Sequence, residues 1–151
     1  MMFRFRRDRR AVATVEFALV TPVMMMFVGG LADFGFELSA KGKLISAASQ
    51  GAQYAYLNPT ASAATIKSIV QTSTPLSGVT ATITGPAYYC ITGTSSVPTM
   101  TLSSAGAVCS DGTTAGYFVK IVASYTYAPL MSDWSGLLST SLTQTVIARM
   151  S

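Results

Sequence analysis

Residues 9–37 read RRAVATVEFALVTPVMMMFVGGLADFGFE, and this stretch decides the fold. The 16 residues from Phe17 to Ala32 carry no charge, whereas a helix needs about 20 apolar residues to cross the hydrocarbon core of a bilayer. Extension in either direction reaches that length only by including Glu16 or Asp33. We therefore predict a transmembrane helix over residues 12–36, with these carboxylates near the two interfaces or neutralised.

The positive charge of the chain is confined to its first residues. Residues 1–10 hold five Arg and one Asp, a net charge of +4, and the whole chain also has +4, so residues 11–151 sum to zero. Basic residues on one side of a membrane helix place that side in the cytoplasm. This predicts a cytoplasmic N-terminus and an exported remainder. No basic surface is left for nucleic acid.

The residue types needed for most catalytic sites are scarce. The chain has no His and two Cys, which excludes His-based acid–base catalysis and any Cys/His zinc site. The acidic residues are scattered singly, and no Gly-rich phosphate loop follows a strand. We expect neither an enzyme, nor a metal site, nor a cofactor.

Three residues of the apolar stretch call for an explanation. A carboxylate at a membrane-helix centre costs roughly 2.5–3.5 kcal/mol, so we expect Glu16 to have a charged partner or to lie at headgroup level near the Arg residues. Asp33 is expected either to be solvated at the outer interface or to contact a neighbouring subunit. Pro22 is expected to bend the helix, because it removes one backbone hydrogen bond.

Residues 37–57 are predicted to continue the same helix. Glu37 and Lys41 form a favourable i,i+4 pair, and Pro59 ends the helix. Small residues recur every fourth position, which allows another backbone to approach closely. This row consists of Ala47, Gly51 and Ala55. It would pack either on a sheet of the same chain or on a helix of another subunit.

Residues 58–151 change in character toward strands. A short helix is expected from residue 60 or 62 to residue 71. The predicted strands are 79–83, 87–92, 116–127 and 142–150. Because strands follow helices consecutively, we predict the α+β class with a small antiparallel sheet.

Cys90 and Cys109 flank a Gly/Ser/Thr-rich loop. Outside the cytoplasm a disulfide is the expected state, with buried free thiols or reactive chemistry as alternatives.

The N-terminal third of the chain resembles the TadE-like family, the membrane pseudopilins of the tight-adherence (Flp) branch of type IV pilus systems. The similar segments are RRAVATVEFALV at 9–20, Pro22, GLADFG at 30–35 and AASQGAQYA at 47–55. The segment YTYAPL at 125–130 shows a weaker similarity.

This resemblance implies a pilin-like fold and prepilin-type processing around Ala11, Val12, Glu16 and Phe17. A prepilin peptidase would remove residues 1–11 as a basic leader, which makes Glu16 the fifth residue of the mature protein. Glu16 would then pair with the new α-amine of Val12 or with that of a neighbouring subunit. Family members usually carry Gly before the cut, where this chain has Ala11.

The function implied is that of a minor pilin or pseudopilin in the bacterial inner membrane, with a periplasmic C-terminal domain and possible incorporation into a pilus for surface attachment. Its partners would be the cytoplasmic membrane, prepilin peptidase, other pilin subunits and the pilus assembly platform. One alternative is an uncleaved, membrane-anchored periplasmic binding or scaffold module. The other is a secreted protein whose signal peptide is cut after Ala32.

Overall fold

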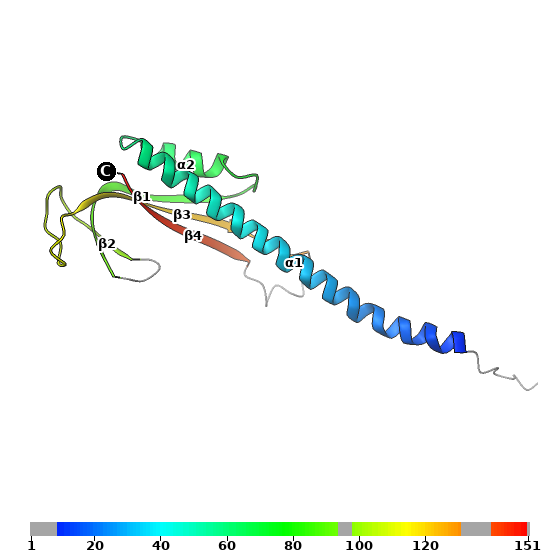
Figure 1. Ribbon diagram of the computed structural model, residues 1–151. Helices are drawn as coiled ribbons and strands as arrows, with labels where there is room; N and C mark the ends of the chain where they lie inside the picture. The colour runs from blue at the N-terminus through cyan, green and yellow to red at the C-terminus, as the bar shows by residue number, and fades with distance from the viewer. Residues whose placement is uncertain (1–8, 94–97, 131–139, 151) are drawn as a thin grey trace, which may run out of the picture.

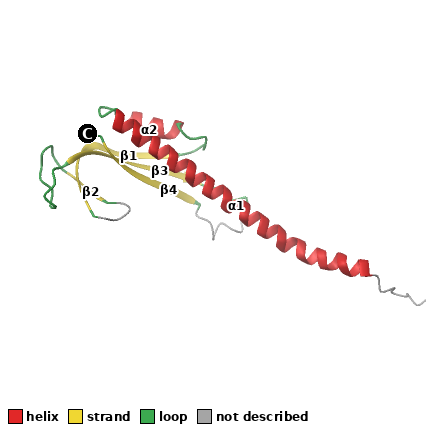
Figure 2. Cartoon of the chain, in the orientation of Figure 1, coloured by secondary structure: helices red, strands yellow, loops and turns green. Residues whose placement is uncertain are grey.

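A computed structural model of the chain describes residues 9–93, 98–130 and 140–150, and side chains from residue 13 onward. Two helices precede four strands (Figures 1 and 2). The elements are α1 (Arg9–Leu57), α2 (Ala63–Thr72), β1 (Thr80–Thr92), β2 (Thr99–Leu102), β3 (Gly116–Thr126) and β4 (Ser141–Arg149). The predicted α+β class, with a long N-terminal helix, a short second helix and an antiparallel sheet, is confirmed.

Helix α1 runs without interruption from Arg9 to Leu57, so the predicted membrane segment and its continuation form one helix. Its 49 residues correspond to about 73 Å at 1.5 Å per residue. Asn58 ends it, and its side-chain amide donates to the carbonyl oxygen of Tyr54 at 3.0 Å. Of the two N-caps expected for α2, Thr60 and Ser62, the structure shows Ser62, whose hydroxyl accepts from the backbone N–H of Thr65 at 3.2 Å.

The four strands form an antiparallel sheet in the order β2-β1-β3-β4. The two segments predicted at 79–83 and 87–92 belong to one strand, β1, because a shift in register between Thr84 and Ala87 lets it continue past Gly85-Pro86. Strand β2, a four-residue edge strand, was not predicted from the sequence. The connection from β2 to β3 crosses β1, and the predicted disulfide between Cys90 in β1 and Cys109 in this connection is present.

The core lies between one face of the sheet and the two helices, which Figures 1 and 2 show on the same side of it. Strand β3 turns alternate residues inward, and Val119, Ile121 and Ala123 are fully buried. Ile121 lies beside Ile83 of β1 and Val146 of β4. Only the C-terminal half of α1 contributes to this core, so its N-terminal half projects from the body (Figure 1).

Candidate functional site

The projecting half of α1 is apolar around most of its circumference, and Glu16 is the one charged residue of its positions 13–32. These 20 residues give about 30 Å of helix, which matches the thickness of a bilayer hydrocarbon core. Large apolar side chains are exposed on every side of this part: Val15, Phe17, Leu19, Val20, Val23, Met24, Met25, Met26, Phe27, Val28 and Leu31. A helix that is hydrophobic all round, yet not covered by its own chain, is typical of a membrane span. Within the described residues, one helix is long and apolar enough to cross a membrane, and it is this one.

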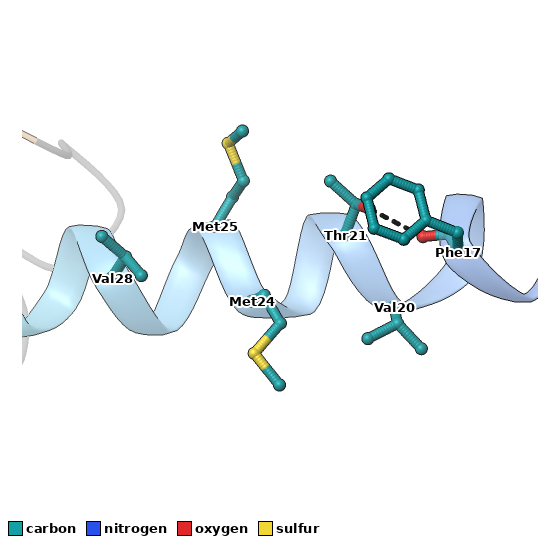
Figure 3. A pocket seen from close by; sticks show the side chains of 6 residues that line it. All are labelled: Phe17, Val20, Thr21, Met24, Met25 and Val28. Atoms are coloured by element: carbon teal, nitrogen blue, oxygen red, sulfur yellow. Dashed lines mark hydrogen bonds between the residues drawn. The ribbon is translucent and has the colours of Figure 1, made fainter.

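A shallow groove follows this surface along Phe17, Val20, Thr21, Met24, Met25 and Val28 (Figure 3). Figure 3 shows Val20 and Met24 on one side of the helix and Thr21 and Met25 on the other. The one polar side chain of the six is satisfied within the helix, because the Thr21 hydroxyl donates to the carbonyl oxygen of Phe17 at 2.7 Å. The groove therefore offers lipid, or another helix, an apolar surface without an unpaired polar group.

Pro22 does not interrupt α1. Figure 1 shows the N-terminal part of the helix running at an angle to the part beside the sheet. That Pro22 causes this bend stays a prediction.

Glu16 is exposed on the projecting half, next to Phe17, which is 72% exposed. The backbone of Ala11 and Val12 is helical, while their side chains and residues 1–8 lie outside the described part of the chain. Positions 12 and 16 are separated by one helical turn, so they share a face of α1.

Asp33 is the residue at which α1 enters the body of the protein. Its side chain is fully buried, so the expectation of a solvated carboxylate was wrong. The Tyr127 hydroxyl donates to the carbonyl oxygen of Asp33 at 3.1 Å and to its Oδ1 at 3.2 Å, and the backbone N–H of Leu130 donates to Oδ1 at 2.7 Å. We call these three residues the Asp33 junction. They supply hydrogen bonds to the buried carboxylate from within the same chain. That Asp33 also contacts a neighbouring subunit stays a prediction.

The junction also perturbs Tyr127. Burial of its ring, and then the hydrogen bond to Asp33, raise the pKa of the Tyr127 hydroxyl above its ordinary value. Glu37, one turn beyond Asp33 on α1, is buried as well and forms the predicted pair with Lys41, at 2.7 Å between Oε1 and Nζ. The buried stripe of α1 therefore begins with two acidic residues before it becomes apolar.

The small-residue row packs inside the chain. Ala47 and Ala55 are fully buried and Gly51 lies between them. A Cβ on Gly51 would collide with Cγ2 of Val70 in α2 and lie 3.4 Å from Cδ1 of Ile121 in β3. Of the two expected roles, the structure shows packing on the chain's own α2 and sheet.

Tyr127 and Leu130 were not predicted as partners of Asp33. Both lie in the segment 125–130, which has a weaker similarity to the TadE-like family in the sequence. Nothing in the sequence pattern links Tyr127 to a residue 94 positions earlier. The part of the chain that the structure describes holds no group of three or more His, Cys, Asp or Glu side chains that could bind a metal.

These features define a class: a subunit with an apolar helix suited to single-pass membrane anchoring and an α+β head on the end of that helix. Residues 11–53 match the family model of the TadE-like protein, which confirms the resemblance for the N-terminal segment. The matched segment contains Glu16, Asp33, Ala47 and Gly51, and it stops before the sheet. No curated protein and no solved structure matches the chain.

Proposed function

We propose that the protein is a minor pilin or pseudopilin that takes part in assembly of a tight-adherence pilus for surface attachment. Its helix anchors it in the bacterial inner membrane with the N-terminus in the cytoplasm, and its α+β head lies in the periplasm. Its partners are prepilin peptidase, other pilin subunits and the assembly platform. The subunit acts by assembly, not by catalysis.

The division of α1 into two halves carries this proposal. From Asp33 to Ala55 one face of the helix is buried against the head, whereas residues 13–32 touch little of their own chain. An all-round apolar surface of this length is stable in a bilayer or among other apolar helices. Both environments are required of a subunit that starts in a membrane and moves into a helical filament.

Glu16, the acidic residue of the projecting half, acts in assembly by pairing with an α-amine. A cut between Ala11 and Val12 creates an α-amine one helical turn from Glu16, or within reach of the Glu16 carboxylate of a neighbouring copy. Either pairing offsets the cost of burying the carboxylate in an apolar environment. A buried ion pair of this kind specifies register more than it adds stability.

Substitution of Glu16 tests this role. Glu16→Gln keeps the size of the side chain and removes its charge, so we expect normal membrane insertion and loss of the subunit from sheared pili. Val15→Ala, at the neighbouring exposed position, is the matched control and should assemble normally. If Glu16→Gln leaves both leader cleavage and pilus incorporation at wild-type levels, the pairing role is wrong.

One observation favours a second candidate, an uncleaved membrane-anchored periplasmic module: Ala11 stands where the family usually has Gly. The exposed apolar helix would anchor such a module equally well. The secreted alternative is disfavoured, because a cut after Ala32 would fall within the continuous helix α1, directly before the buried Asp33. The N-terminal residue of the protein from its host separates the three.

A further inference from the structure

A pocket of about 240 Å³ lies on the face of the sheet opposite the two helices. Because Val119 of β3 faces the core, its neighbour Phe118 lies on this other face. Across the sheet Phe118 pairs with Ala87 of β1 and with Arg149 of β4. Figure 1 places the connection 103–115, which forms part of the pocket, at the end of the head remote from the projecting half of α1.

The floor of this pocket is apolar and contains aromatic rings. Tyr89 of β1 and Gly116 of β3 lie opposite each other, and both are buried. A Cβ on Gly116 would lie 2.5 Å from Cε2 and 2.9 Å from Cζ of Phe118. The Phe118 ring therefore lies over Gly116, and only a glycine leaves room for it there. Ile91 and Cys109 complete the floor.

The rim of the pocket is polar and is held in place by its own loop. Oδ1 of Asp111 accepts from the backbone N–H of Thr113 at 3.0 Å and from its hydroxyl at 2.7 Å. The disulfide ties Cys109 to β1, and its backbone N–H donates to the carbonyl oxygen of Thr113 at 2.8 Å. Thr114 and Arg149 complete the rim. The pocket is thus formed before a ligand arrives, which reduces the entropic cost of binding.

The charges of the rim favour an uncharged ligand. Asp111 and Arg149 are both exposed, and within the described chain no ion pair joins them. An anion would be attracted by the guanidinium but repelled by the carboxylate, and the reverse holds for a cation. Neutral hydroxyls form strong hydrogen bonds with both groups, because a charged partner strengthens the bond. The rim therefore selects a ligand rich in hydroxyl groups.

The floor and the volume narrow the ligand to a single saturated ring. The 240 Å³ of the pocket are fewer than the roughly 300–1,000 Å³ of sites for drug-sized molecules. A pyranose has C–H bonds on its face and hydroxyls around its edge. The C–H face fits the ring of Phe118, because the face of an aromatic ring carries partial negative charge. A flat aromatic ligand would cover the floor but leave the rim without partners.

We propose that this pocket binds the pyranose ring of an uncharged sugar, with Phe118 beneath the ring and with Asp111 and Arg149 at its hydroxyls. The binding requires only the folded head. A contribution to surface attachment, in which the sugar is the end of a glycan, rests on the proposed function. The position of the pocket, remote from the membrane helix, is open to such a contact (Figure 1).

Saturation-transfer NMR of the full chain tests the binding with the methyl glycosides of glucose, galactose, mannose and N-acetylglucosamine. The detergent must lack a sugar headgroup, because a glycoside detergent would compete for the pocket. We expect a dissociation constant on the order of 1 mM for at least one of these small ligands. No transfer from any of them at a concentration about tenfold higher would overturn the proposal. Binding of inorganic phosphate in place of the sugars would overturn it too.

Three variants locate the binding. Asp111→Asn keeps a side-chain oxygen for Thr113 but removes the charge, so the loop should stay folded while the affinity for the sugar falls about tenfold. Gly116→Ala displaces the Phe118 ring and should also weaken binding. Lys120→Gln, on the same face of the sheet but outside the pocket, is the matched control and should bind as the wild type. Wild-type affinity of Asp111→Asn, or an equal loss in Lys120→Gln, would contradict the site.

Attachment of host cells to beads that carry the bound sugar separates a surface glycan from a free sugar. For a surface glycan, cells with Asp111→Asn should assemble pili that contain the subunit and yet attach at least about fivefold less, since many weak contacts act together. Wild-type attachment of these cells would overturn the role of the pocket in attachment. Pili that lack the wild-type subunit would contradict the proposed function, whereas the sugar binding is judged by the NMR experiment.

Discussion

The hydroxyl of Tyr127 bonds both the main-chain and the side-chain oxygen of Asp33, at 3.1 and 3.2 Å. This contact joins the end of β3 to the point at which the membrane helix leaves the head. It is buried, and it connects the segment that matches the TadE-like family model with a segment outside that match. These hydrogen bonds therefore add a polar contact at the N-terminal end of the apolar packing between α1 and the rest of the chain.

Removal of the Tyr127 hydroxyl should destabilise the protein. Tyr127→Phe leaves Asp33 with one fewer donor in a buried environment, for which we expect a loss of about 1–2 kcal/mol in the free energy of unfolding. Denaturant unfolding of the detergent-solubilised chain measures it. Tyr125→Phe, two positions earlier in β3, is the control, because no hydrogen bond joins its hydroxyl to the helix among the described residues. Equal losses for the two variants would show that the hydrogen bonds to Asp33 contribute nothing specific.

Two substitutions of Asp33 should differ in effect. Asp33→Ala leaves the Leu130 N–H without its acceptor and the Tyr127 hydroxyl with only the main-chain oxygen of residue 33, which we expect to cost about 1–3 kcal/mol in unfolding free energy. Asp33→Asn retains an acceptor oxygen of the same shape and should cost less than half as much. The comparison uses the same unfolding assay, and a larger loss for Asn than for Ala would contradict the hydrogen-bonding role.

The raised pKa of Tyr127 predicts a dependence of stability on alkaline pH. A group whose pKa is higher in the folded state binds its proton more tightly there. Its contribution is complete below the ordinary value of 10.0 and is lost as the pH rises through the folded-state pKa. Melting temperatures between pH 8 and pH 12 should therefore fall more steeply above about pH 10 for the wild type than for Tyr127→Phe. Parallel curves would refute the assignment to Tyr127.

Gly51 should not tolerate a side chain. A methyl group at this position collides with Val70, so Gly51→Ala should lower the unfolding free energy by about 1–3 kcal/mol. The double variant Gly51→Ala with Val70→Ala should lose less than the sum of the single variants, because the smaller partner makes room. Gly35→Ala, in open space on the same helix, is the matched control and should not destabilise the separated subunit. Strict additivity would contradict the contact.

The disulfide should stabilise the β2–β3 connection. Cys90 and Cys109 are 19 positions apart, and closing a loop of this size contributes about 3 kcal/mol in the chain-entropy model. Replacement of both residues by Ser should lower the unfolding free energy by a comparable amount, and reduction of the wild type should match the double variant. Free thiols in the unreduced protein from its host, detected by a thiol label, would contradict the bond.

The sequence predicted the elements of the fold better than their connections. The periodicity of α1 and the alternation of β3 reflect local burial, so both were found within a few residues. The edge strand β2 was missed because its four residues acquire strand geometry from pairing with β1, not from a pattern of their own. The break at Gly85-Pro86 divided the prediction of β1, whereas the sheet accommodates it by a shift in register.

The residues of the site were predicted to different degrees. Charge and hydropathy identify Glu16 and Asp33 as unusual, because any acidic residue in an apolar run is unusual. Whether such a residue is solvated or buried depends on what folds against it. Tyr127 folds against Asp33, because the sheet brings it close to α1. Likewise, the small-residue row predicted a close approach but could not tell a neighbouring subunit from α2.

We propose that a leader is removed from a membrane-anchored subunit whose mature helix begins at Val12, one turn before Glu16. The intact mass and N-terminal sequence of the protein purified from membranes and pili of its own host test this cleavage. We expect a chain that starts at Val12 in both fractions. A chain that still carries residues 1–11, or one that starts at Asp33, would contradict the proposed cleavage.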